Sequence, residues 1–192
     1  MDTQSKKTMM EQEAAARFVQ YLMQAAREAW PTIESSMKEF YKDKFIVEEE
    51  KIAAYNLGLA LIAQDLQAVP NLFPPDQAKR LEEWVYDCVD IEDWGEYAKE
   101  EVKKYGEKFQ HDLNNHENPI YAIPARLLHR WLGKGIQNFD VELNGKKTGI
   151  LDPLLVEMLG GILISQFSGT WKKVVLQGDV ELVAGDRNLK PS

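Results

Sequence analysis

The clearest structural signal in this sequence is the stretch VEEEKIAAYNLGLALIAQDLQAV, residues 47–69. Three glutamates stand near its start, where the dipole of a helix favours negative charge. From Ile52 to Ala63 the only polar residue is Asn56, so the helix has no polar side. Helices of this kind are usually buried. The stretch therefore predicts a central helix of a bundle, and its apolar run of twelve residues is too short to span a membrane.

Helical patterns flank this stretch on both sides. Residues 9–30 carry apolar side chains at spacings of three and four, and Pro31 then ends or kinks the helix. A second helical pattern covers residues 75–114, which is long for a single helix. Gly95 and the acidic residues near it favour two helices that meet near residues 90–93.

The C-terminal third mixes helix with short strands. The apolar segment 153–168 predicts a second central helix. The sequence DVELNGKKTG, residues 140–149, contains the Asn-Gly pair typical of a two-residue hairpin loop. Residues 174–183 predict a strand or hairpin. Because the tetrapeptide DVEL occurs at 140–143 and again at 179–182, these two strands are candidates to pair with each other.

Together these patterns predict a mostly α, single-domain protein. We expect a multi-helix bundle of five to seven helices, with a small β hairpin or two-stranded appendage near the C-terminal third. The length of 192 residues fits one domain with its own core. Hydrophobic residues make up 44% and charged residues 28%, so general disorder is not expected. Only the ends, residues 1–8 and 186–192, are expected to be disordered.

Charge and cysteine content limit the classes of function. The net charge is −8, and residues 76–101 alone hold ten acids and three bases. An acidic chain is poorly suited to bind the phosphate backbone broadly, so no nucleic-acid partner is expected. The single cysteine, Cys88, excludes a disulfide framework within the chain, and the first residues lack the apolar core of a signal peptide. The sequence therefore indicates a cytoplasmic protein with no membrane partner.

The segment EEWVYDCVDIEDWGEYAKEE, residues 82–101, has nine acids among twenty residues. Helix capping and ion pairs at helical spacing account for most of them. Asp87 and Asp90, however, have no basic residue three or four positions away. Three interpretations follow: a solvated helix face, a docking surface for a basic partner that includes Glu83, Asp87 and Asp90, or a cation site.

A second candidate surface lies in the predicted short helix 124–133. Its basic residues Arg126, His129, Arg130 and Lys134 follow at spacings that place them along one side of that helix. This basic side could pair with the acidic residues inside the fold, pair with them across a dimer, or bind an anionic ligand. A plain solvated face is the fourth alternative.

Catalytic and metal-binding patterns are weak. If there is a metal site, its expected ligands are Asp87, Asp90, His111 and Asp112. The sequence GKKTG, residues 145–149, lacks the spacing of a phosphate-binding P-loop. No cofactor is implied. The sequence therefore favours a non-enzymatic protein-interaction or regulatory module that binds a protein partner or itself. The alternative is a metal-dependent hydrolase of the phosphohydrolase or nucleotide pyrophosphatase type on a helical scaffold.

Replacing Asp87 and Asp90 together by alanine separates these two hypotheses. The hydrolase hypothesis predicts that the double variant loses cation binding. A plain solvated face predicts little change, or a gain of about 0.2–0.5 kcal/mol per relieved like-charge pair. Thermal melts with and without millimolar magnesium, manganese, zinc or calcium measure the difference, because a cation that binds only the folded chain raises its melting temperature. A rise with one cation that the double variant loses would contradict the interaction hypothesis.

Overall fold

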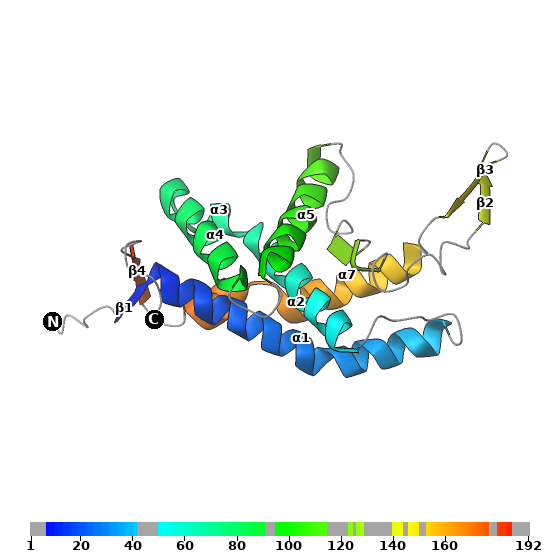
Figure 1. Ribbon diagram of the computed structural model, residues 1–192, viewed down its shortest axis with the longest axis horizontal. Coiled ribbons are helices and arrows are strands. Elements are labelled where there is room, and N and C mark those ends of the chain that lie inside the picture. The colour runs from blue at the N-terminus through cyan, green and yellow to red at the C-terminus, as the bar shows by residue number, and fades with distance from the viewer. Residues whose placement is uncertain are drawn as a thin grey trace.

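The computed structural model describes residues 7–41, 50–90, 95–114, 123–124, 126–128, 140–143, 146–149, 153–176 and 180–185. In chain order its elements are β1 (Lys7–Met10), α1 (Glu11–Tyr41), α2 (Glu50–Leu66), α3 (Val69–Leu72), α4 (Pro75–Asp90), α5 (Gly95–Asn114), β2 (Asp140–Leu143), β3 (Lys146–Gly149), α7 (Pro153–Phe167), the π-helical turn η4 (Trp171–Val175) and β4 (Val180–Val183). This mostly helical architecture with two-stranded sheets confirms the fold class predicted from the sequence (Figure 1).

Helix α2 is the buried centre of the protein, as its apolar sequence predicts. Residues 53–63 are all buried, and the helix packs against both α1 and α5 (Figure 1). A Cβ atom added to Gly58 would collide with Sδ of Met23 on α1. The two helices therefore approach most closely at a residue that has no side chain.

The helical stretch Lys51–Leu72, which covers most of α2 and all of α3, is by length and composition alone long and apolar enough to cross a membrane, and its most apolar window of 18 residues has a mean hydropathy of 1.2. The twelve-residue run from Ile52 to Ala63, which alone is too short, is part of this longer stretch. In the part of the chain that the structure describes it is the one stretch of this kind, and 72% of its most apolar window is buried. Core helices of soluble proteins have the same properties, so this is weak evidence for a membrane span.

Helix α1 runs along one side of the protein and changes direction along its length (Figure 1). Its buried face includes Phe18, Leu22 and Ala26 at spacings of four, as the sequence pattern predicts. The helix continues through Pro31, which has no N–H to donate to the preceding turn. Pro31 therefore kinks the helix rather than ending it.

Residues 75–114 form two helices, as the sequence favours. Helix α4 ends at Asp90 and α5 begins at Gly95, while residues 91–94 lie outside the described part. Helix α4 packs on α1, and α5 packs on α2. Both helices stand on the same side of α1 and diverge from their adjoining ends (Figure 1).

Helix α7 forms where the sequence predicts it, but it is not a central helix. It buries Leu159 and Leu163, whereas Gly161, Ile164 and Ser165 are exposed. The expectation of a second central helix is therefore wrong, because α7 covers the core with one side only.

The π-helical turn η4 stands where the expected strand 174–183 would begin, so the prediction is wrong for residues 174–175. The ring of Trp171 stacks on Phe18 with a centroid distance of 4.2 Å and meets the edge of Phe73 at 5.7 Å. These contacts hold Trp171 fully inside the core. If residues 174–175 formed a strand, the turn η4 would not stay packed against α1, where Trp171 stacks on Phe18.

The strands pair differently from what the repeated DVEL predicts. Strand β2 pairs antiparallel with β3, and Leu143 lies opposite Lys146, which confirms the two-residue hairpin. Strand β4 instead pairs in parallel with β1, and Lys7 lies opposite Val180. The pairing of the two DVEL segments is therefore wrong, because each has a different partner.

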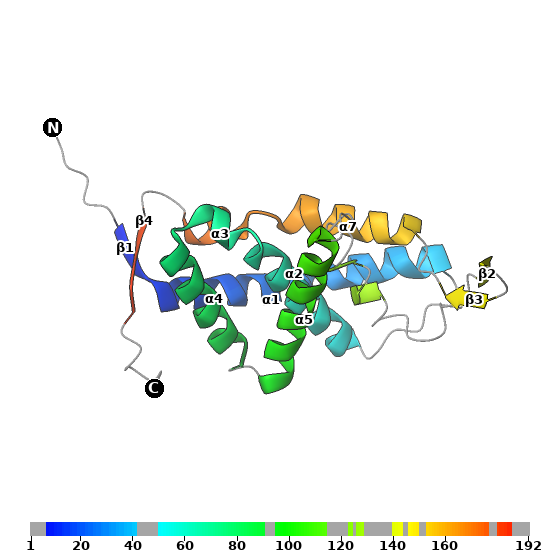
Figure 2. The same cartoon turned by 90° about the horizontal axis from the view of Figure 1, so that it is seen from above.

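The two sheets lie at opposite ends of the protein (Figure 2). Strand β1 begins within residues 1–8, for which the sequence predicts disorder. Residues 1–6 and 186–192 lie outside the described part of the chain.

A buried carboxylate ties the β1–β4 sheet to helix α4. Glu11 is fully buried and accepts two hydrogen bonds from Arg80, one from Nε and one from Nη2, each 2.8 Å long. Nε2 of Gln77 donates to Oε1 of Glu11 at 3.1 Å and to the carbonyl oxygen of Leu182 at 3.3 Å. The bonds from Arg80 lower the pKa of Glu11, although burial alone would raise it.

The replacement Glu11→Gln is expected to lower the free energy of unfolding by about 1.5–3 kcal/mol at neutral pH, because charge-assisted hydrogen bonds are lost. The folded-state pKa of Glu11 lies below its ordinary value of 4.5. Its contribution is therefore present above that pH and disappears as the pH falls through the folded-state pKa. Denaturant unfolding of the wild type and of Glu11→Gln at a series of pH values should show that the difference between their free energies of unfolding becomes smaller in acid.

Glu13→Gln is the matched control, because Glu13 forms an exposed pair with Arg17 one turn away. Pairs of this kind contribute about 0.3–0.5 kcal/mol. A Glu11 variant as stable as the Glu13 variant would contradict the assigned role of Glu11.

Candidate functional site

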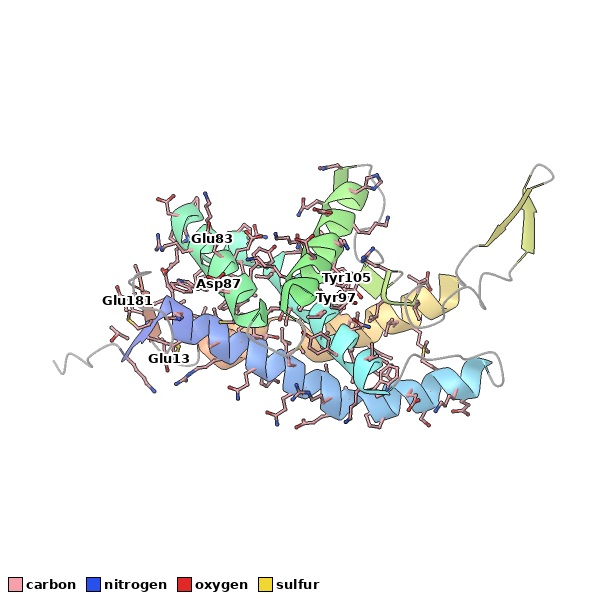
Figure 3. The ribbon with its side chains drawn as sticks, viewed as in Figure 1. Glu13, Glu83, Asp87, Tyr97, Tyr105 and Glu181 are labelled. Atoms are coloured by element: carbon pink, nitrogen blue, oxygen red, sulfur yellow. The ribbon has the colours of Figure 1, made fainter. Side chains whose placement is uncertain are left out.

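A cleft opens between α4 and α5 where the two helices diverge (Figure 3). Its narrow part has a volume of about 430 Å³ and is lined by Glu83, Trp84, Tyr86, Asp87, Lys99 and Lys103. Its wide part has a volume of about 630 Å³ and extends over the C-terminal end of α2 and over α3. Both linings include Tyr86 and Lys103, so the two parts adjoin at these side chains.

Opposite charges face each other across the narrow part. Helix α4 contributes an acidic row, Glu83 and Asp87, and helix α5 contributes a basic row, Lys99 and Lys103. The closest contact joins Nζ of Lys99 to Oδ1 of Asp87 at 3.9 Å, and these side chains are 32% and 56% exposed. An exposed pair at this distance contributes little to stability. Lys103 also has a partner on its own helix, because its Nζ lies 3.5 Å from Oε1 of Glu100.

Tyr86 lies where the two parts of the cleft join. Its hydroxyl donates to Oε1 of Glu82 at 2.9 Å, and Nζ of Lys103 lies 5.8 Å from the centre of its ring. Burial and the neighbouring Glu82 raise the pKa of Tyr86, so the phenol stays neutral. Tyr86 therefore presents a neutral aromatic ring on the α4 side of the cleft, where the two parts adjoin.

The wide part of the cleft combines an apolar floor with a polar wall. The floor is formed by the buried side chains of Leu66, Val69 and Ala78. On the opposite wall, Nε2 of Gln110 donates to Oε1 of Gln67 at 2.8 Å. This bond joins α5 to the C-terminal end of α2 and fixes the width of the cleft there.

The structure brings two of the three predicted acidic docking residues to this cleft. Glu83 and Asp87 line its narrow part and are labelled in Figure 3. Asp90 is the last residue of α4, and its side chain lies outside the described part. Sequence spacing left Asp87 without a basic neighbour, but Lys99 supplies one from the next helix. Spacing within one helix cannot reveal such a contact.

Arg126 pairs inside the fold, which is one of the alternatives that the sequence left open, although its partner is not one of the acids of residues 83–90. Its Nε and Nη2 donate to Oε1 of Glu101 at 3.1 and 2.7 Å, and Glu101 is 3% exposed. The guanidinium also lies 5.3 Å from the ring centre of Tyr105. Arg126 therefore pairs inside the fold, with a buried acid of α5. His129 and Arg130 lie outside the described residues.

Asp87 and His111, the two predicted metal ligands whose side chains the structure describes, are not brought together. Asp87 contacts Lys99 near the start of α5, whereas His111 is exposed about twelve residues further along the same helix. That separation corresponds to about 18 Å of helix. The side chains of Asp90 and Asp112 lie outside the described part. Among the described residues, no group of three or more His, Cys, Asp or Glu side chains could hold a metal ion.

Cys88, on the same helix as Tyr86, is half-buried. Burial, with a smaller effect from Asp87, raises its pKa to about 11. The thiol is therefore protonated at neutral pH and is a poor nucleophile.

Three buried acids were missed by the sequence analysis: Glu11, Asp65 and Glu101. A signal for them exists in the sequence, because each stands three positions from a buried apolar residue of its own helix. These apolar residues are Ala14, Ile62 and Ala98. An acid at such a position lies on the apolar face and needs a partner there.

Asp65 fixes the turn that begins η4. Its Oδ1 accepts a hydrogen bond from the backbone N–H of Gly169 at 3.3 Å, and Oδ2 accepts one from Thr170 at 3.1 Å. Gly169 has a φ of 78°, which favours glycine. Burial raises the pKa of Asp65, and these hydrogen bonds oppose the rise. Asp65 is thus a structural acid that joins α2 to η4.

Comparison with known proteins gives no relative whose function could be transferred to this chain. The chain matches no protein-family model, and neither the curated proteins nor the solved structures show significant similarity to it. The function is therefore argued from the cleft alone.

The replacement Asp65→Asn is expected to destabilise the protein by about 1–3 kcal/mol in acid, because one of two buried backbone N–H groups loses its acceptor. The folded-state pKa of Asp65 is raised above 3.8, so ionisation weakens the folded state. The advantage of aspartate is therefore complete below that pH and declines as the pH rises through the folded-state pKa. Denaturant unfolding from acid to neutral pH should show that the difference in unfolding free energy between the wild type and Asp65→Asn becomes smaller. A difference that grows toward neutral pH would contradict the role assigned to Asp65. Asp65→Ala, which loses both acceptors, should be less stable than Asp65→Asn throughout.

Proposed function

We propose that this protein is a cytoplasmic, non-enzymatic interaction module whose α4–α5 cleft binds a protein partner. The proposal is carried by one observation: the narrow part of the cleft has acids and Tyr86 on its α4 wall and lysines on its α5 wall. The charged side chains are only loosely paired with each other, as the 3.9 Å contact between Lys99 and Asp87 indicates.

The composition of the cleft suits a protein ligand. Interfaces between proteins combine a few aromatic anchor residues with a polar, solvent-accessible rim. Tyr86 provides an anchor with little freedom to move, because its hydroxyl and its ring both have partners. The acidic and basic rows provide the rim. Small-molecule sites are instead mostly apolar, with few polar groups.

A metal-dependent hydrolase is the alternative, and the cleft offers it less support. Divalent cations such as magnesium need carboxylates whose oxygens are free to ligate. Asp87 faces the ammonium group of Lys99, which competes with a cation for the same oxygen. His111 lies far from Asp87 along α5, so it does not complete a ligand set with it.

The variant Tyr86→Ala is expected to lose the protein partner, because it removes the aromatic anchor at the centre of the cleft. Tyr21→Ala is the matched control, since Tyr21 is 43% exposed on α1 and lies outside the cleft. Both variants and the wild type are immobilised and exposed to an extract of the source cells. A protein retained by the wild type and by Tyr21→Ala, but not by Tyr86→Ala, is then purified and its affinity for all three is measured directly.

A loss of affinity of at least about tenfold in Tyr86→Ala alone supports the proposal. Equal affinity of all three proteins would place the binding site elsewhere. Cation-dependent hydrolysis of phosphoester substrates by the purified wild type, lost in Asp87→Ala, would favour the hydrolase instead.

A further inference from the structure

Residues 180–185, here called the strap, touch the helix that forms one wall of the cleft. They lie at the end of the molecule where α1 begins (Figure 2). Nε2 of Gln77 on α4 donates a hydrogen bond to the carbonyl oxygen of Leu182 at 3.3 Å. Gly185 lies against Trp84, because a Cβ atom added to it would stand 3.6 Å from Cζ2 of the indole. Gln77 and Trp84 are about two helical turns apart, so the strap holds α4 at two separate points.

One of these two points belongs to the cleft itself. Trp84 lines the narrow part of the cleft, and it is almost fully buried. Tyr86, where the two parts of the cleft adjoin, follows two residues later on the same helix. A change in the position of the strap is therefore felt first at the α4 wall of the cleft.

The other supports of α4 leave its tilt undetermined. Helix α4 packs on α1, and a pair of packed helices tolerates a range of crossing angles. The bonds between Arg80 and Glu11 fix one further point of α4. A helix fixed at one point can still tilt about it. Because Gln77 and Trp84 lie on either side of Arg80 along the helix, the strap contacts oppose this tilt and so determine the distance between α4 and α5.

The attachment of the strap to the rest of the fold is light. In the part of the chain that the structure describes, β4 pairs with β1 alone, and a sheet of two strands has little stability of its own. The side chains of Val180, Leu182 and Val183 are only half-buried. Pairing with β1 also closes a long loop, which costs entropy.

We propose that the strap is a conformational device that sets the width of the α4–α5 cleft. While the strap is docked, α4 is held in the position that binds the partner. When the strap is released, the helices remain folded but α4 tilts relative to α5, and the cleft loses the preorganised shape that favours binding. This inference rests on the proposed function of the cleft.

The variant Glu181→Pro tests the proposal, because proline has no N–H to donate and is disfavoured inside a paired strand. Glu181 is exposed, so no core contact is lost (Figure 3). Glu181→Ala is the matched control, since it removes the same side chain and keeps the N–H. Hydrogen exchange of the amides of residues 180–183 is expected to be at least about tenfold faster in Glu181→Pro than in Glu181→Ala, while the amides of α2 stay protected in both.

Two spin labels report the position of α4. They are attached to cysteines that replace Asp76 near the start of α4 and His111 near the end of α5, with Cys88 replaced by alanine. Asp76 and His111 are exposed and line neither part of the cleft. Pulsed electron–electron resonance is expected to give the same distance distribution with the native strap and with Glu181→Ala, and a shifted, broader distribution with Glu181→Pro.

The partner retained in the Tyr86→Ala experiment supplies a second measurement. Its affinity for Glu181→Pro is expected to be at least about tenfold lower than for Glu181→Ala. An equal affinity for both variants would overturn the inference. So would an unchanged distance between α4 and α5 in a Glu181→Pro protein whose strap amides exchange rapidly.

If Glu181→Pro does not fold, or its strap stays protected, Gln77→Leu replaces it. This variant loses the donor to Leu182 and to Glu11 at similar side-chain size. Gln24→Leu is its control, because Gln24 is exposed and bonds only within α1 to Glu28. An α4 that keeps its distance from α5 in Gln77→Leu would overturn the inference. The distances are measured without a partner, so a cleft that binds no protein would overturn the proposed function and leave the control of its width by the strap standing.

Discussion

Helix α2 has no polar side, so it is stable in water only when other parts of the chain cover it completely. Helix α1 covers one side, and the missing side chain at Gly58 allows the two backbones to approach closely. Helix α5 covers another side. The same requirement accounts for the cleft. Helix α4 packs on α1, whereas α5 packs on α2. Because they pack on different helices, α4 and α5 diverge from each other (Figure 1). The candidate site is thus a consequence of how the core is covered.

Buried carboxylates join the outer segments to this core, and their surroundings differ in one respect. Glu11 has a cation, Arg80, as its main partner, and its pKa is lowered. Asp65 is bonded chiefly to neutral backbone and hydroxyl groups, and burial raises its pKa. Both acids stabilise a junction between elements distant in the sequence. Their shifted pKa values therefore reflect structural roles, although such shifts often mark catalytic groups.

The parts of the fold that depend on local pattern could be predicted from the sequence. The buried α2, the division of residues 75–114 into two helices and the Asn-Gly hairpin all follow from periodicity, capping and turn chemistry. The partner of β4 could not be predicted, because strand pairing over long separations leaves no local signal. The turn η4 was likewise unexpected, since its helical form depends on the tertiary contacts of Trp171.

The candidate site, too, could be predicted from the sequence only in part. Glu83 and Asp87 could be predicted as unusual because their own helix supplies no counter-charge to Asp87. Lys99, Lys103 and Tyr86 could not, because only the crossing of α4 and α5 brings them to the same cleft. The partner of Arg126 could not be predicted for the related reason that Glu101 belongs to a different part of the chain, α5.

The parallel pairing of β1 with β4 has a consequence for the order in which the protein folds during synthesis. Strand β1 leaves the ribosome long before β4 does. Arg80 emerges at an intermediate point, so Glu11 can find its cation before β1 has a strand to pair with. The second acceptor of Gln77, the carbonyl oxygen of Leu182, comes much later. The β1–β4 sheet therefore cannot form until β4 has been made, and its pairing closes a long loop at an entropic cost.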